Sequence, residues 1–258
     1  MRILLTNDDG LESPALLPTI QMLETIGDVD VVVPRYEQSW TSKSNIRRAK
    51  TIVKETHEVD GYHITTLDAR PADCANYGIF NLDETPDLVV SGANVGHNVG
   101  ISAFFSSGTI GAALEGIFVG IPSVAISIPY QSGARLVSEP FEEAIQGAED
   151  LLETFYHQPP ENTGLMVVNL PYGKSQKSLI ATSLGRYPYG RLFIDEKNCI
   201  RPSRYQELSY PKDIEKGTDV WARKENLGSV VMMDFDARLH NPAKVSSWLD
   251  LHQLNSLG

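Results

Sequence analysis

Hydrophobic and polar positions along the start of the chain predict a strand, a helix and a second strand. Residues 3–5 are continuously apolar and precede turn-forming residues, which is typical of a short buried strand. Ser13 can then cap a helix in which Pro14 occupies the first position, apolar residues recur on one face, and Gly27 ends the pattern. The β-branched residues 29–33 predict the second strand. This order indicates a parallel βαβ unit.

The same alternation continues further along the chain. Asp60-Gly61 lies between two strand-like runs, residues 51–53 and 62–67, and predicts a β-hairpin. The other elements predicted up to residue 170 are helices over residues 71–80, 108–119 and 139–156 and buried strands over residues 88–91, 122–128 and 165–170. Beyond Pro171, strand-like segments at residues 179–183 and 228–233 alternate with polar stretches, and a last helix is expected after Asn241-Pro242.

Buried strands that alternate with helices predict an α/β fold with an open, doubly wound and mainly parallel sheet. The chain of 258 residues suits one domain. We divide it into an α/β core over residues 1–170 and a hairpin-rich extension over residues 171–258. Ligands bind outside the carboxyl ends of the strands in such sheets, so functional residues are expected in the loops that follow the strands.

Charge and composition narrow the range of partners. The chain has 22 Lys+Arg and 33 Asp+Glu residues, a net charge of −11, which argues against polymeric nucleic acid as a partner. Its 2 cysteines are far apart and form neither a disulfide framework nor a CxxC site. The apolar runs are too short for a signal peptide or a membrane span. We therefore expect a cytoplasmic protein with no membrane partner.

Two adjacent carboxylates follow the first predicted strand. Asp8 and Asp9 suit a hard divalent cation, because side by side they raise each other's pKa and a bound cation removes that cost. Ser39 and Asn94 follow two other strands and can add neutral oxygen ligands, a set that favours Mg²⁺ or Mn²⁺ over Zn²⁺. Each residue also has an explanation without a metal. The aspartates can form a solvated turn, the Ser39 hydroxyl can cap its loop, and Asn94 can be present because asparagine tolerates a positive φ between glycines.

A second cluster opens the helix predicted at residue 108. Ser107, Gly108 and Thr109 resemble an anion cradle, in which backbone N–H groups and hydroxyls bind a phosphate, although a helix N-cap is the simpler interpretation. A cation beside such a cradle suits phosphoryl transfer to water. Asn98 and the helix N-terminus would stabilise charge on the phosphoryl oxygens. One aspartate would act as base toward the water, or as a direct nucleophile.

Several segments together resemble the SurE (survival protein E) family of 5′-nucleotidases and acid-type phosphatases. The similar segments are residues 1–10, 87–96 and 107–113, Arg70-Pro71-Ala72-Asp73-Cys74 and, more weakly, Gly217-Thr218-Asp219-Val220. The resemblance implies a phosphomonoesterase with one divalent cation per subunit, Mg²⁺ or Mn²⁺, that hydrolyses nucleoside 5′-monophosphates. It leaves 3′-monophosphates and short polyphosphate open as further substrates. It also implies a Rossmann-like fold whose C-terminal extension associates the subunits into a homodimer or homotetramer.

Residue by residue, the resemblance assigns two roles. It implies metal ligands at Asp8, Asp9, Ser39 and Asn94 and phosphate contacts at Asn98, Ser107, Gly108 and Thr109. The reaction chemistry given above adds catalytic roles for Asp8, Asp9 and Asn98. The chain departs from the family pattern at residues 100–106 and around Trp40, which puts base preference in doubt. Trp40, Phe104 and Phe105 can stack on a nucleobase, but buried packing or a subunit contact explains them equally well.

Other classes of function compete with this interpretation. The alternative is a non-catalytic nucleotide- or metal-binding protein of the same fold that keeps the ligands without turnover. A dinucleotide-dependent oxidoreductase is excluded, because acidic residues stand where a GxGxxG motif would follow the first strand. A dehalogenase-type phosphatase would need Asp-x-Asp rather than adjacent aspartates, and a serine hydrolase of the nucleophile-elbow type would need GxSxG.

Overall fold

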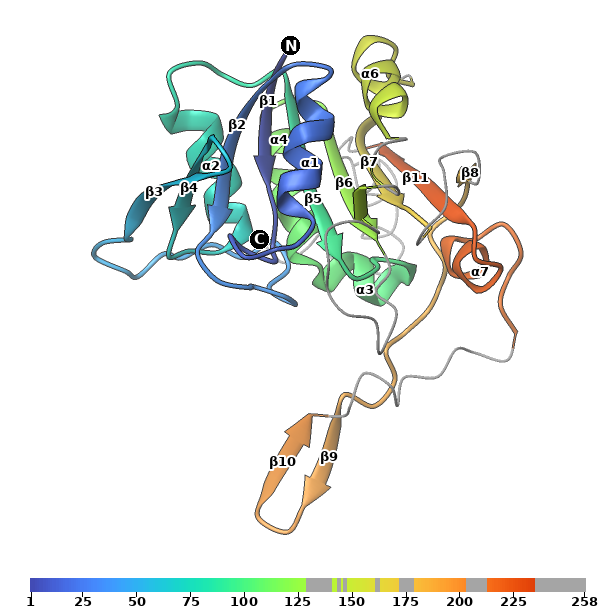
Figure 1. Ribbon diagram of the computed structural model, residues 1–258. Helices are drawn as coiled ribbons and strands as arrows, with labels where there is room; N and C mark the ends of the chain where they lie inside the picture. The colour runs from blue at the N-terminus through green and yellow to red at the C-terminus, as the bar shows by residue number, and fades with distance from the viewer. Residues whose placement is uncertain are drawn as a thin grey trace, which may run out of the picture.

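The computed structural model describes residues 1–128, 141, 142, 145, 148–160, 163–171, 179–202 and 213–234. Its main strands are β1 (Arg2–Thr6), β2 (Asp28–Pro34), β3 (Lys54–Val59), β4 (Tyr62–Leu67), β5 (Leu88–Val95), β6 (Ser123–Ile128), β7 (Thr163–Asn169), β8 (Leu179–Ala181) and β11 (Gly228–Asp234). They form one sheet in the order β3-β4-β2-β1-β5-β6-β7-β11-β8 (Figure 1). The pairs β3–β4 and β7–β11 are antiparallel and the other pairs are parallel. The predicted α/β fold with a mainly parallel sheet is confirmed.

Helices cover both faces of this sheet. They are α1 (Leu16–Glu24), α2 (Pro71–Asn81), α3 (Gly100–Ser106), α4 (Gly108–Phe118), α6 (Glu149–His157) and α7 (Asp219–Lys224). Ile3 and Leu5 of β1 pack in the same core cluster as α1, whereas Leu4 packs in the cluster that contains residues of α2. Successive side chains of a strand point to opposite faces, so the continuously apolar run at residues 3–5 serves two cores.

None of the helices in the described ranges is by itself long and apolar enough to cross a membrane. The pair α3 and α4 meets the length and hydropathy requirement only when the two are taken together, and it is bent by 67°.

Three predicted element boundaries are wrong. One concerns the helix expected over residues 139–156, because α6 begins at Glu149 with Ala148 as its N-cap. Helix α1 begins at Leu16 with Ala15 as its N-cap, so neither Ser13 nor Pro14 takes its predicted position. The chain turns first, because the Ser13 N–H donates to the Gly10 carbonyl at 3.3 Å and the Leu16 N–H donates to the Ser13 carbonyl at 3.1 Å. The hairpin at Asp60-Gly61 is present, but its first strand is β3 at Lys54–Val59 rather than residues 51–53.

The C-terminal region contributes to the same sheet. The strand-like segments at residues 179–183 and 228–233 correspond to β8 and β11, and β11 pairs with β7 of the core. Strands β9 (Phe193–Glu196) and β10 (Cys199–Pro202) form a separate hairpin that projects away from the sheet (Figure 1). The division at residue 171 stays a prediction, and the helix predicted after Asn241-Pro242 lies outside the described residues.

The strand order places a switch point beside β1. From β1 the chain passes to β2 on one side, and β5 pairs with β1 on the other side. Crevices form where the winding of a doubly wound sheet reverses, at the carboxyl ends of the strands. The loop after β1 carries Asp8 and Asp9, and the carboxyl end of β5 carries Asn94. The topology therefore brings these candidate ligands to one crevice.

Candidate functional site

Asp8 and Asp9 leave the end of β1 in different directions. The Asp8 carboxylate is buried and accepts a hydrogen bond from the Thr109 hydroxyl at 2.8 Å, so it faces helix α4. The Asp9 carboxylate accepts the backbone N–H of Val95 at 2.7 Å, so it faces the end of β5. The two carboxylates thus connect the first strand to the two elements that carry the other candidate residues.

Asn98 joins this group from the loop that follows β5. Its side-chain amide donates to the Thr109 hydroxyl at 3.3 Å and to the Ser127 hydroxyl at 2.9 Å. Its backbone N–H donates to the side-chain oxygen of Asn169 at 2.9 Å, which fixes the loop to β7. Asn98, Thr109 and Asp8 therefore form one buried hydrogen-bonded chain. Sequence reasoning predicted these three but missed Ser127 and Asn169, which support them.

The N-terminus of α4 lies against the Asp8 carboxylate. A Cβ atom at Gly108 would lie 3.0 Å from Asp8 Oδ2 and 3.0 Å from the Thr41 hydroxyl, so only glycine fits without movement. The Ser107 hydroxyl accepts the backbone N–H of Ile110 at 3.2 Å and is the N-cap of α4. Ser107 therefore has the capping role that was the simpler interpretation of the sequence. Gly108 and Thr109 lie at the positive end of the helix dipole beside the aspartates.

Ser39 lies on the loop after β2 and is exposed. Its hydroxyl donates to Glu37 Oε1 at 2.7 Å, while the neighbouring Gln38 N–H donates to the Asp8 carbonyl at 2.6 Å. The backbone of this loop is therefore fixed beside Asp8, although the Ser39 side chain is engaged elsewhere. Asn94 directly precedes Val95, whose backbone N–H binds Asp9, and Asn94 is 8% exposed.

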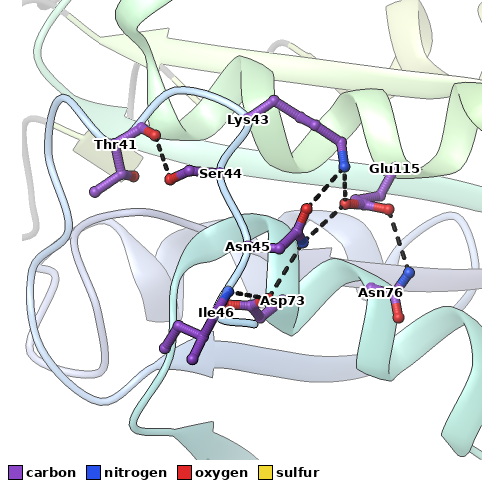
Figure 2. Close-up of polar contacts among 8 residues, drawn as sticks. All are labelled: Thr41, Lys43, Ser44, Asn45, Ile46, Asp73, Asn76 and Glu115. Atoms are coloured by element: carbon purple, nitrogen blue, oxygen red, sulfur yellow. Dashed lines mark hydrogen bonds and ion pairs between the residues drawn. The ribbon is translucent and has the colours of Figure 1, made fainter. Parts of the chain in front are cut away.

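The loop that follows Ser39 is anchored by a polar network (Figure 2). The Lys43 ammonium pairs with Glu115 of α4 at 2.5 Å, and the Asn45 side-chain amide donates to Glu115 and to Asp73, each at 3.2 Å. Asp73 also accepts the backbone N–H of Ile46 at 3.1 Å. The motif residue Asp73 thus fixes this loop to α2, and its carboxylate also accepts the Arg70 N–H at the start of that helix.

Two further residues of the site, besides Ser127 and Asn169, were missed by sequence reasoning. Thr41 approaches Gly108 and Asp8 only because the loop is held in this position, and nothing in its local sequence signals the contact. Asp219 is 1% exposed, and its carboxylate accepts the N–H groups of Gly100 and Gly185, both at 2.7 Å. It therefore holds the start of α3, directly after the Asn98 loop. The weak resemblance around Asp219 was the available signal.

Burial raises the pKa of both candidate aspartates. Loss of solvation is the largest cause for each, and the negative charge of Asp8 raises the pKa of Asp9 further. In the described part of the chain, no lysine, arginine or histidine forms an ion pair with either carboxylate. Among these described residues, no cationic side chain therefore balances the two carboxylates.

A cavity of about 380 Å³ opens beside Asp9. Its lining residues are Asp9, Glu12, Ser13, Pro14, Arg35, Tyr36, Glu37 and Val95. Arg35 pairs with Glu55 at 3.2 Å, so the carboxylates of the cavity outnumber the available cationic charge. An anionic substrate would be repelled here unless a bound cation changed the sign of the local charge.

The donor set fits a hard cation. The described residues contain no group of three or more His, Cys, Asp or Glu side chains that could hold a metal ion, which makes a zinc-type site there a poor fit. Asp8 and Asp9, with the amide of Asn94, instead offer the oxygen donors that Mg²⁺ and Mn²⁺ prefer, and Mg²⁺ commonly binds through one or two carboxylates while keeping several waters.

Comparisons with known proteins show which family the chain resembles. The chain matches the family model described as "Survival protein SurE" over residues 3–191. It is 38% identical to the "5'-nucleotidase SurE" of Herpetosiphon aurantiacus over 245 residues, 92% of this chain and 93% of the relative. It is 32% identical to the "5'-nucleotidase SurE" of Archaeoglobus fulgidus over 245 residues, 92% of each chain.

A solved structure supports the same conclusion. The crystal structure of the SurE protein from Aquifex aeolicus superimposes with a TM-score of 0.74 at 27% sequence identity, covering 98% of this chain and 100% of that chain. The family model thus covers residues 3–191, and these relatives and the solved structure each cover at least 92% of the chain. The chain belongs to the SurE family.

Proposed function

We propose that this chain is a 5′-nucleotidase, a divalent-metal-dependent phosphomonoesterase that releases phosphate from nucleoside 5′-monophosphates. The observation that carries the proposal is the buried chain Asp8–Thr109–Asn98 at the N-terminus of α4, with Asp9 beside it at the sheet's switch point. The curated relatives named 5'-nucleotidase SurE support the same activity.

The proposed metal ligands are Asp8, Asp9, Asn94 and Ser39. When bound, a divalent cation would polarise the phosphoryl group and supply an activated water. Ser39 is the weakest member of this set, because its hydroxyl is bonded to Glu37 and must rotate to serve as a ligand. The raised pKa values of Asp8 and Asp9 favour metal binding at neutral pH over more acidic pH, because protons compete for the same oxygens.

The chain's own residues then hold the phosphate. The N–H groups of Gly108 and Thr109, at the start of α4, would donate to a bound phosphate and stabilise its negative charge. The Asn98 amide, oriented by Ser127, would donate to a phosphoryl oxygen by exchanging its bond to Thr109. The Ser107 side chain contributes by capping the helix. One of the two aspartates accepts the proton of the attacking water.

The test is phosphate release from AMP in Mg²⁺ or Mn²⁺, compared with the same assay in EDTA. We expect turnover that requires the divalent ion and that falls by a factor of about 10³ or more in Asp8→Asn and Asp9→Asn, because each change removes one ligand charge. Asp68→Asn is the matched control, because Asp68 also follows a strand of the sheet but is exposed. It should keep normal turnover.

The competing proposal is a binding protein without turnover. If no phosphate is released from a panel of 5′- and 3′-monophosphates and short polyphosphate with either metal, the hydrolase proposal fails. Nucleotide binding measured by calorimetry would then support the non-catalytic alternative. Near-normal turnover of either asparagine variant would instead show that the metal assignment is wrong.

We further propose that residues 171–258 associate the subunits into a homodimer or homotetramer. The β9–β10 hairpin supports this, because it projects from the sheet with Phe193 and Ile200 more than half exposed. Apolar side chains on a two-stranded hairpin without a core favour burial against another surface. Light scattering after gel filtration tests the assembly, and a monomeric mass would contradict it.

A further inference from the structure

Trp40 stands out on the loop between the candidate ligand Ser39 and the site residue Thr41. Its backbone has φ = 63°, a region that bulky residues rarely adopt. The residue is nevertheless 49% exposed, so burial in the core does not account for this conformation. A large aromatic ring is therefore held, at some conformational cost, at the edge of the candidate phosphate site.

The Trp40 ring is stacked on a second aromatic ring. The centroids of Trp40 and Tyr189 are 4.5 Å apart with an interplanar angle of 21°. The Tyr189 hydroxyl forms a 2.6 Å hydrogen bond with the Ser106 hydroxyl, and the Tyr189 N–H donates to the Ser102 hydroxyl at 3.3 Å. Helix α3 thus fixes the supporting ring, and one face of Trp40 is occupied by Tyr189 while the residue keeps half of its surface open.

Both rings are attached next to the proposed phosphate-binding segment. Ser106, which holds Tyr189, directly precedes Ser107, Gly108 and Thr109. On the other side, the Thr41 hydroxyl lies 3.0 Å from the position that a Cβ atom of Gly108 would take. A phosphate ester bound at the start of α4 therefore has the Trp40–Tyr189 pair within reach of its organic part.

We propose that the open face of Trp40 stacks on the nucleobase of the substrate. This inference rests on the proposed nucleotidase function and names the residue that binds the base at the same site. Aromatic side chains stack on the π-face of any base. Phe104 fits less well, because it is 3% exposed and buried in the core. Phe105 is 63% exposed, but its ring packs edge-on against Phe104 rather than in the stack with Tyr189.

The kinetic test compares AMP with ribose 5-phosphate, which carries the same phosphate and sugar but no base. Trp40→Gly removes the ring at a position where glycine accepts φ = 63° without cost, so the variant should fold. We expect the ratio of kcat/KM for AMP to kcat/KM for ribose 5-phosphate to fall about tenfold, mainly through KM. Trp40→Phe keeps an aromatic face and should restore most of that ratio.

Two further variants separate the alternatives. Tyr36→Ala alters the cavity beside Asp9, which is the competing place for the base, and should leave the ratio within about twofold of the wild type. Phe80→Ala removes an exposed aromatic residue at the end of α2 and serves as the matched control. A selective loss for AMP in Tyr36→Ala rather than in Trp40→Gly would overturn the proposal. An equal loss of kcat/KM for both substrates in Trp40→Gly would overturn it as well. So would a change in the oligomeric mass of that variant, measured by light scattering.

A binding measurement keeps this inference separate from the proposed function. The chain has 3 tryptophans, and we expect adenosine to quench part of their fluorescence in the wild type but not in Trp40→Phe. If the wild type hydrolyses neither phosphate ester, the nucleotidase proposal fails, while this quenching would still support a base-stacking site. Equal quenching in both proteins, or none in the wild type, would refute the stacking site.

Discussion

The ion pair between Glu115 and Lys43 allows a quantitative prediction about what holds the loop over the site. Glu115 lies in α4 with its side chain 8% exposed, and the Lys43 side chain is 28% exposed. Besides the ammonium of Lys43, the carboxylate accepts the side-chain amides of Asn45 at 3.2 Å and Asn76 at 3.3 Å (Figure 2). Glu115→Ala therefore leaves one charge and two amides without their acceptor.

The magnitude follows from these contacts. Removing one partner of a buried ion pair costs about 3–5 kcal/mol, because the remaining charge is left without compensation. Lys43 is partly exposed and can turn its ammonium to water, so we expect about 3 kcal/mol for Glu115→Ala. For a chain of this size, that is a fall in Tm of about 6–12 °C. Glu115→Gln keeps an amide oxygen as acceptor and should cost about 1–2 kcal/mol.

The assay is a double-mutant cycle with Lys43→Met, measured by urea unfolding. If the pair is coupled as described, the double variant Glu115→Ala/Lys43→Met should be about 1–2 kcal/mol more stable than the sum of the single changes predicts. Additive losses would show that the ion pair contributes nothing beyond packing. A cost below about 1 kcal/mol for Glu115→Ala would refute the reasoning that this network anchors the loop.

Three other changes test different parts of the structure. Gly108→Ala should keep the fold but weaken Mn²⁺ binding about tenfold or more by calorimetry, because the added methyl group would meet Asp8 Oδ2 and Thr41 at 3.0 Å; unchanged affinity would contradict this. Asp219→Asn should lower the free energy of unfolding by about 2–4 kcal/mol, since an amide cannot accept all the N–H bonds that the carboxylate accepts from Gly100 and Gly185; a cost under about 1 kcal/mol would speak against the clamp. Burial, and secondarily the charge of Arg223, lowers the pKa of His97 to about 3, so the unfolded chain takes up a proton below its ordinary pKa of 6.5 while the folded protein does not. The free energy of unfolding should therefore fall by up to about 1.4 kcal/mol for each pH unit below pH 6.5. His97→Gln should make this dependence on pH less steep, as measured by urea unfolding between pH 7 and 5. Equal slopes in the variant and the wild type would exclude His97 as the cause.

The local elements of this protein are encoded in short stretches of its sequence. The strands at β1, β2 and β6 and the helices α2 and α4 follow from runs and periodicities of apolar residues, because burial on one or both faces is decided by neighbours along the chain. Where the boundaries were wrong, contacts outside the local pattern decided them. A hydrogen-bonded turn at Ser13 delays the first helix, and pairing with β4 sets β3 at Lys54–Val59. The expectation that polar clusters follow the strands needed only the strand order of a doubly wound sheet.

The partners of the candidate residues were decided by the tertiary structure. The aspartate pair was evident from the sequence, but the bonds of Asp8 to Thr109 and of Asp9 to Val95 join residues 101 and 86 positions apart. The approach of Thr41 to Gly108 depends on the anchor of its loop at Glu115. The stack of Trp40 depends on Tyr189, which is 149 positions away in the sequence. Such contacts arise when separate elements close on one another, so a local pattern names the reactive groups while long-range packing decides what each one faces.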